Sequence, residues 1–153
     1  MPLNPVDSKD LLILDALKRN AKASVARLAK ETGLPGTTIH NRIDKLRSSG
    51  IIRGYTIKVD NKKLGNDIGA FLAVTVDYDS LKKSKIGQEE LAEKIGELRF
   101  VEAVSIVTGD YDIIVKVRVK NIEELNKFII RELRTYPGIE KSYTMIILSE
   151  VID

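Results

Sequence analysis

The stretch from Ser24 to Gly50 constrains the fold of this chain more than any other. It has the pattern of two short helices joined by a tight turn at residues 33–35, where a glycine ends one helix and a proline favours the start of the next. In the second helix Ile39, Ile43 and Leu46 recur at helical spacing and form a buried stripe. The pattern predicts a helix-turn-helix.

The other face of that second helix is polar and positively charged. When such a helix lies in the major groove, asparagine pairs with adenine, arginine with guanine, and hydroxyl groups with bases or phosphates. We therefore expect this face to contact double-stranded DNA, although the same two helices would also suit a plain helical hairpin in a core. The residues on this face are Thr37, Thr38, Asn41, Arg42, Lys45 and Ser48.

Arg42 and His40 each have a second interpretation. Arg42 lies beside Ile43, a position that also suits an internal ion pair with a carboxylate. His40 is the only histidine, and a metal site needs further ligands that the neighbouring sequence lacks. We expect no metal site, and we expect the imidazole of His40 at the surface or in contact with a phosphate.

The flanking segments complete an N-terminal domain. Asp7 is suited to cap a helix that has Asp10 in its first turn, and the apolar residues within 11–17 give a broad face that packs across the other two helices. At 51–60 the period changes from that of a helix to that of a strand, which predicts a small wing. Arg53 on this strand could reach a phosphate, although exposed charges on strands more often serve only solubility.

Charge divides the chain into two parts. Residues 1–65 carry 13 Lys or Arg and 6 Asp or Glu, whereas residues 66–153 carry 12 and 16. The basic half suits a polyanion as its partner, or a solvated basic face. The segment 61–67, rich in Gly, Asn and Asp, has the composition of a hinge. We therefore expect a domain at 1–60, a linker at 61–67 and a second domain at 68–153.

The second half alternates strand and helix patterns in the order βαββαβ. This is the order of a ferredoxin-like domain, in which two helices cover one face of a sheet. The fold class is therefore α+β: a three-helix, winged helix-turn-helix domain followed by a ferredoxin-like domain. The predicted strands are 70–77, 101–107, 112–119 and 139–148, and the predicted helices are 90–98 and 122–134, with a Lys- and Ser-rich loop at 80–87.

The uncovered face of that sheet needs a partner. Six strand residues are too apolar for half of them to face water, which predicts a homodimer joined sheet to sheet or edge to edge, or a second protein over the face. They are Val74, Val76, Ile113, Val115, Val117 and Ile147.

Composition excludes several classes of protein. The chain has no cysteine, which rules out disulfides, thiolate metal sites and cysteine nucleophiles. It has no nucleophile elbow and no Gly-rich phosphate loop, so we do not expect an enzyme. No apolar run approaches the roughly 18 residues of a membrane span, and the N-terminus lacks a signal-peptide pattern. We expect a cytoplasmic protein without a cofactor and, given the helix-turn-helix, one that is nucleoid-associated.

A set of motifs is spread over nearly the whole chain, at residues 7–14, 28–34, 38–46, 50–55 and Gly65 and, in the second half, at 109–112 and 139–144. Together they resemble the Lrp/AsnC family, the feast/famine transcription regulators. Pro35 stands where many members have a serine that caps the recognition helix, and proline is tolerated at a helix start.

The resemblance implies a homodimer that assembles further, often into octamers, binds DNA through its N-terminal domains and responds to an amino acid. It places Thr37, Thr38, Asn41, Arg42 and Lys45 at positions that face DNA. A second function is kept open, a stand-alone amino-acid sensor like the ACT-type modules. Such a sensor would control a protein partner by contact, and the basic helices would be its docking surface.

The resemblance also implies an effector site at Gly109, Asp110 and Asp112, on the turn between the central strands, with Ser142 and Thr144 on the last strand. Carboxylates suit the ammonium group of a free amino acid, and a glycine turn with hydroxyls suits its carboxylate. The same turn residues are also expected in an ordinary hairpin. Asp112 either selects a cationic side chain such as lysine or arginine, or is used by a backbone N–H or by a lysine of a neighbouring subunit. In the second case a neutral amino acid such as glutamine or leucine fits as well.

Overall fold

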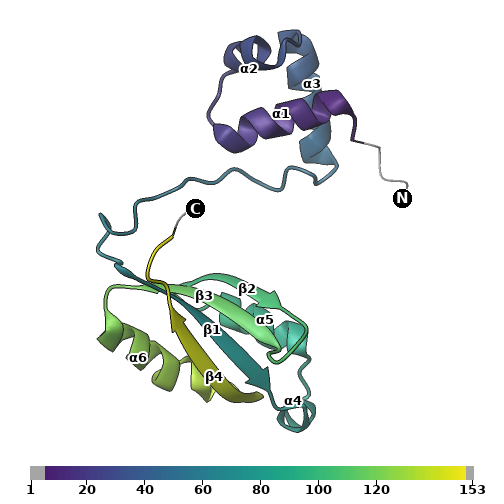
Figure 1. Cartoon of the computed structure of the whole chain (residues 1–153). Coiled ribbons are helices and arrows are strands. Elements are labelled where there is room, and N and C mark those ends of the chain that lie inside the picture. The colour runs from purple at the N-terminus through teal and green to yellow at the C-terminus, as the bar shows by residue number, and fades with distance from the viewer. Residues whose placement is uncertain (1–5, 151–153) are drawn as a thin grey trace. The chain divides into compact units, whose positions relative to one another are not determined.

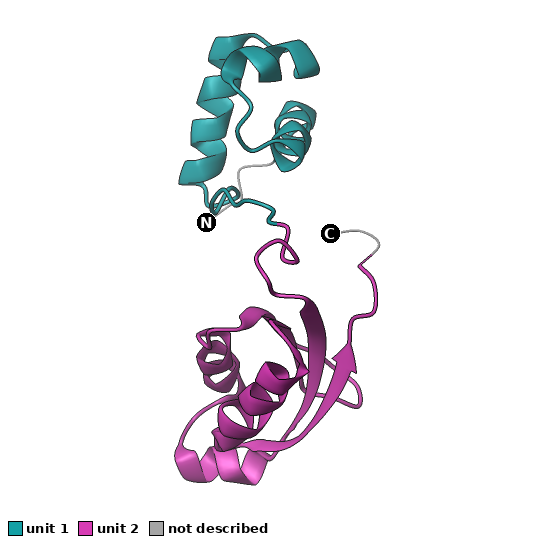
Figure 2. Cartoon of the chain, turned by 90° about the vertical axis from the view of Figure 1, so that its left-hand side faces the viewer, with its two compact units in different colours: residues 1–59 teal, residues 60–153 magenta. Residues whose placement is uncertain are grey.

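The computed structural model describes residues 6–150, which fall into two compact units, unit 1 up to Val59 and unit 2 from Asp60 onward. Figure 2 shows the two units in different colours. Each unit has a hydrophobic core of its own, so each is described by itself.

Unit 1 consists of three helices, α1 (Ser8–Arg19), α2 (Val25–Thr32) and α3 (Gly36–Ser48), labelled in Figure 1. The predicted three-helix core is confirmed, except that Leu11 is exposed and Leu14 is only half-buried. The residues buried together are Ile13, Ala16, Leu17, Leu28 and Ile39, with Leu34 and Ile43 packed against them.

The turn between α2 and α3 has the backbone that its sequence predicts. The Ser24 hydroxyl caps α2 by accepting the Arg27 N–H at 3.3 Å. Gly33 ends the helix with φ 70° and ψ 11°, in the left-handed region, and its N–H donates to Ala29 O. Pro35 occupies the N-cap position of α3 and offers no side-chain hydrogen bond there. Helix α3 therefore starts directly after the proline.

The strand predicted at 51–60 is wrong, because the backbone of these residues forms no strand in the described part of the chain. The alternation of Tyr55, Ile57 and Val59 is present, and all three side chains are exposed. A strand needs a neighbouring strand for its N–H and C=O groups, and unit 1 contains helices as its only regular elements among residues 6–59.

Unit 2 is the predicted ferredoxin-like domain. Its four antiparallel strands lie in the order β2-β3-β1-β4, so the first and third strands along the chain form the centre. Helices α5 and α6 lie on one side of the sheet (Figure 2). The elements are β1 (Ile68–Val76), α4 (Tyr78–Ser84), α5 (Gln88–Gly96), β2 (Val101–Ile106), β3 (Ile113–Val119), α6 (Ile122–Arg131), the 3-10 helix η1 (Leu133–Thr135) and β4 (Ile139–Ile146).

Helix α4 replaces part of the loop that the sequence predicts at 80–87. Asp77 caps it by accepting the N–H groups of Asp79 at 3.0 Å and Ser80 at 3.2 Å. Leu81 is its one buried residue and packs at Gly138, where any side chain would overlap it. A helix this short has too few apolar residues to show a period, so its sequence looks like a loop.

The residues predicted for the uncovered sheet face lie mostly on the other side. Five of the six, all except Ile147, belong to the core beneath α5 and α6. Successive strand residues point to opposite faces, so the uncovered face carries the residues between them. These are Phe71, Ala73 and Thr75 on β1, Ile114, Lys116 and Arg118 on β3, and Tyr143 and Met145 on β4, with Ile147 just beyond.

Candidate DNA-reading helix and effector turn

Helix α3 buries one stripe and exposes most of the predicted DNA-contacting residues. Ile39 and Leu46 are inside unit 1, at 0% and 1% exposure, so the opposite side of the helix faces solvent. Arg53 is also exposed, but on the segment after the helix. Of the predicted residues on α3, Thr37, His40, Asn41 and Lys45 are exposed, and Thr38 and Arg42 are half-buried.

Arg42 is engaged inside unit 1, as in the ion-pair interpretation of its sequence. Its Nη1 lies 2.7 Å from both carboxylate oxygens of Asp7 and 2.8 Å from Oδ1 of Asp10. Asp7 and Asp10 also form the capping box of α1, each accepting the other's backbone N–H. Arg42 therefore fastens α3 to the first turn of α1.

The charges in this cluster support one another. The guanidinium of Arg42 holds the pKa of Asp7 below its ordinary value, and the two carboxylates raise the pKa of Arg42. Asp10 is only 1% exposed, and its carboxylate is paired with Arg42 and accepts the Asp7 backbone N–H. Because its guanidinium is bound by two carboxylates, Arg42 is poorly placed to pair with guanine.

His40 faces a carboxylate on its own helix. Its Nε2 lies 3.3 Å from Oδ2 of Asp44, one turn further along α3, and both side chains are exposed. Among residues 6–150 no group of three or more acidic or histidine side chains is arranged to hold a metal ion.

The effector turn lies between β2 and β3. Gly109 has φ 119°, a conformation that other residues rarely adopt, and Asp110 is exposed beside it. Asp112 is half-buried, and both oxygens of its carboxylate have partners: Oδ2 accepts the Val76 N–H and Oδ1 accepts the Tyr78 hydroxyl, each at 2.8 Å.

The backbone of Asp112 is fixed as well. Its N–H donates to Val74 O at 2.9 Å, and its carbonyl accepts the Val107 N–H at 2.9 Å and Nε2 of Gln88 at 3.3 Å. One residue therefore joins the turn to β1, to the end of β2, to α4 and to the start of α5.

The structure does not bring the two halves of the predicted effector site together. Ile113, next to Asp112, pairs with Val74 on one side of β1, whereas Ser142 pairs with Val74 on the other side. The Ser142 hydroxyl accepts Nε of Arg134 at 3.1 Å, and Thr144 is exposed further along β4. Within one chain, the width of a strand separates Asp112 from these hydroxyl groups.

Sequence reasoning did not find Tyr78 and Gln88, which hold the turn. Each contacts Asp112 from more than 20 residues away, at separations of 34 and 24 positions. No local period or spacing signals a contact of that kind. The available signal was the length of the segment between β1 and α5, which is unusual. This length did not indicate what the segment does.

Known protein families match both units. A family model described as Lrp/AsnC ligand binding domain matches residues 69–153, and one described as winged helix-turn-helix DNA-binding matches residues 6–53. The HTH-type transcriptional regulator FL11 of Pyrococcus horikoshii is 39% identical over 145 residues, which are 94% of this chain and 90% of FL11.

The chain belongs to the Lrp/AsnC family of transcriptional regulators. Regulatory protein AsnC of Escherichia coli is 36% identical over 147 residues, 96% of this chain and 93% of AsnC. The solved structure of AsnC matches with a TM-score of 0.81 at 34% identity, covering 97% of this chain and 96% of that one. A regulator from Neisseria meningitidis, solved as its complex with L-Met, shares the fold with a TM-score of 0.86 at 19% identity, covering 97% of this chain and 94% of that one.

Membership of this family favours a DNA-binding regulator over a stand-alone sensor. The helix-turn-helix match covers α1, α2 and α3, and the ligand-binding match covers nearly all of unit 2. Both domain matches, together with the similarity to the transcriptional regulator FL11, make this chain a DNA-binding transcriptional regulator. No helix within residues 6–150 is both long enough and apolar enough to span a membrane.

Proposed function

We propose that this regulator reads DNA through the exposed face of α3, as a homodimer, and that an amino acid bound at the 108–112 turn controls its binding. The observation that carries the DNA part is the division of α3 into two faces. Ile39 and Leu46 are buried, while Thr37, Asn41 and Lys45 face solvent on the other side. A helix held by one face and free on the other suits the major groove.

The roles on this helix follow from side-chain chemistry. Asn41 is suited to pair with adenine, and Thr37 and Thr38 are suited to bases or phosphates. Lys45 carries a charge without a directional pattern, so we assign it to phosphate. His40 and Arg53 are further candidates for phosphate contacts. We assign Arg42 mainly a structural role, because its guanidinium is bound by Asp7 and Asp10.

Binding to DNA selected from a random pool tests this assignment. Asn41→Ala should cost about 1–3 kcal/mol at the selected site and little on random DNA. Lys45→Ala should weaken binding to all sequences and reduce the slope of log affinity against log salt by about one. Lys30→Ala is the matched control, since Lys30 is an exposed lysine in the last turn of α2. Unchanged affinity in both variants, with Lys30→Ala also unchanged, would remove α3 from the interface.

The effector part rests on the free carboxylate of the turn. Asp110 is exposed, whereas both oxygens of Asp112 are occupied within the chain. We assign the ammonium group of the amino acid to Asp110 and its carboxylate to the N–H groups of the turn, with Gly109 allowing close approach. The Neisseria regulator solved with L-Met supports an amino acid as the class of ligand. Ser142 and Thr144 alternate with Tyr143 and Met145 along β4 and so lie on the helix side of the sheet. They would join the site only from a further copy, in an assembly larger than the sheet-to-sheet dimer.

Calorimetry with each of the twenty amino acids tests the effector site. Asp110→Asn should weaken every amino acid that binds, because each has the same ammonium group. If the wild-type protein binds no amino acid, unit 2 has another ligand and this part of the proposal fails. The DNA measurements above do not depend on that outcome.

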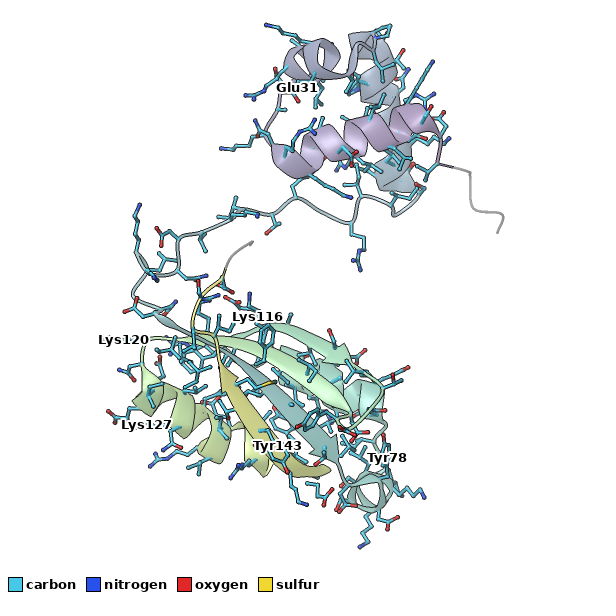
Figure 3. The ribbon with its side chains drawn as sticks, in the orientation of Figure 1. Glu31, Tyr78, Lys116, Lys120, Lys127 and Tyr143 are labelled. Atoms are coloured by element: carbon cyan, nitrogen blue, oxygen red, sulfur yellow. The ribbon has the colours of Figure 1, made fainter. Side chains whose placement is uncertain are left out.

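A homodimer is supported by the sheet face that the helices leave uncovered. Phe71, Tyr143 and Met145 on this face are 38%, 51% and 49% exposed. The charges at one end are paired within the chain: Lys116 and Arg118 contact Glu102 and Glu150 at 2.7–3.4 Å. Figure 3 shows Lys116 and Tyr143 on the sheet. An apolar face with neutralised charges suits the same face of a second copy.

Sedimentation of the full chain tests the dimer. Phe71→Glu places a charge in the proposed interface and should shift the protein toward monomer, whereas Ile122→Glu, at an exposed position on α6, should not. An unchanged mass for Phe71→Glu at every concentration would contradict this interface. We also expect the dimers to assemble further, into a particle such as an octamer. We expect this particle to act in the cytoplasm, at the nucleoid, by binding DNA and not by catalysis.

A further inference from the structure

Helix α4 stands beside the effector turn and is fastened to it. The helix begins at Tyr78, directly after β1, and the Tyr78 ring is 49% exposed while its hydroxyl donates to Oδ1 of Asp112. Figure 3 places Tyr78 at this corner of unit 2. The base of the helix is held independently by the Asp77 cap and by the buried side chain of Leu81.

The contact decides how many carboxylates the turn offers to a ligand. Asp110 and Asp112 lie two positions apart, so the sequence presents a pair of negative charges. Two free carboxylates would favour a ligand with a second positive charge, such as lysine or arginine. The backbone N–H of Val76 occupies Oδ2 of Asp112, and the Tyr78 hydroxyl occupies Oδ1. Only Asp110 is left with its carboxylate in solvent.

We propose that Tyr78 is a positioning residue of the effector site, which withholds the Asp112 carboxylate and so selects an amino acid with an uncharged side chain. This inference rests on the effector turn of the proposed function. It gives α4 a role, because the helix carries the hydroxyl to Asp112. Gln88 supports the same arrangement from the start of α5 by donating to the Asp112 carbonyl.

Removal of one hydroxyl tests the selection. Tyr78→Phe keeps the ring and the helix but frees Oδ1 of Asp112. Lysine and arginine should then gain about tenfold in affinity relative to neutral amino acids, the scale of one charge-assisted hydrogen bond. Adding Asp112→Asn to Tyr78→Phe should abolish that gain, because the freed oxygen no longer carries the charge.

Two controls separate positioning from a loss of structure. Tyr55→Phe removes a hydroxyl from an exposed tyrosine of unit 1 and should leave the ranking of the twenty amino acids unchanged. The contact with Asp112 also raises the pKa of Tyr78 above its ordinary value of 10.0. In an absorbance titration, one of the five tyrosines should therefore ionise later in the wild type than in Asp112→Asn.

The outcomes distinguish this inference from the proposal beneath it. A uniform loss of affinity in Tyr78→Phe, or an unchanged ranking, overturns the inference and leaves the effector turn in place. A wild type that already prefers lysine or arginine overturns it too, since Asp112 would not be withheld. If the wild type binds no amino acid, the effector site itself is wrong and the role of Tyr78 falls with it.

Discussion

The turn of the helix-turn-helix allows a sharp test at Gly33. Its φ of 70° lies in the left-handed region, and a Cβ built at this position has no atom within 4 Å. A side chain there meets open space, so the whole effect of Gly33→Ala comes from the backbone. Gly54 is the matched control, because its added Cβ also meets nothing within 4 Å and its φ lies outside the left-handed range.

The size of the effect follows from two opposing terms. Holding an L-residue in the left-handed region costs about 1–2 kcal/mol. Replacing glycine also restricts the unfolded chain, which returns about 0.4–1 kcal/mol. The net loss for Gly33→Ala is therefore about 1 kcal/mol, or about a fivefold change in the unfolding equilibrium of unit 1. Gly33→Asn should lose less, since asparagine tolerates this conformation better than alanine.

Amide hydrogen exchange measures the prediction directly. Amides of α2 and α3 should exchange about fivefold faster in Gly33→Ala, while those of unit 2 keep their rates. Gly54→Ala should match the wild type or be slightly more protected. DNA affinity at low temperature should be retained in all three variants, because the exposed face of α3 is unchanged. Equal losses in Gly33→Ala and Gly54→Ala would refute the backbone argument.

Three further predictions concern the contacts that join distant segments. Asp10→Asn should lower the thermal stability of unit 1 because it removes the buried partner of Arg42, whereas Asp15→Asn, at an exposed position of the same helix, should not; calorimetry on the full chain compares them. Hydrogen bonds from Lys116 and Arg118 lower the pKa of Glu150 below its ordinary value of 4.5. These ion pairs hold residues 147–150 to β3, so they are complete above about that pH and are lost as the pH falls through the lowered pKa. Backbone NMR signals of these residues should move over that acid range in the wild type and not in Glu150→Gln. Gly138→Ala should cost about 1–3 kcal/mol by overlap with Leu81 and about 1–2 kcal/mol more because φ at Gly138 is 94°, as measured by denaturant unfolding. Leu81→Ala in the same chain should remove the overlap part of the additional loss and leave the backbone part.

The helix-turn-helix and the order of the strands and long helices in unit 2 could be predicted because their signals are local. Ser24, Gly33 and Pro35 set the ends of α2 and α3 through backbone preferences that need no distant partner. The strands and long helices of unit 2 repeat their apolar residues with the period of the element that they form. The predicted α+β class therefore agrees with the structure.

The local sequence did not show which face of the sheet each strand residue occupies. Val74 and Val115 look equally suited to a dimer interface or to a core, because alternation alone does not say which side α5 and α6 cover. The residues between them, such as Phe71 and Tyr143, are less apolar as a set and were therefore overlooked. The packing of the helices decided the matter.

The sequence by itself determined that the chain has a helix-turn-helix and a ferredoxin-like domain. It also determined that two aspartates, Asp110 and Asp112, lie at the turn between two strands of that domain's sheet. Only the tertiary structure decided what the charged groups do. Arg42 meets Asp7 and Asp10 from more than 30 positions away, and Tyr78 meets Asp112 across a similar distance. Hydrogen bonds between such residues depend on how the elements pack, and packing is set by the whole core and not by the spacing of any one segment.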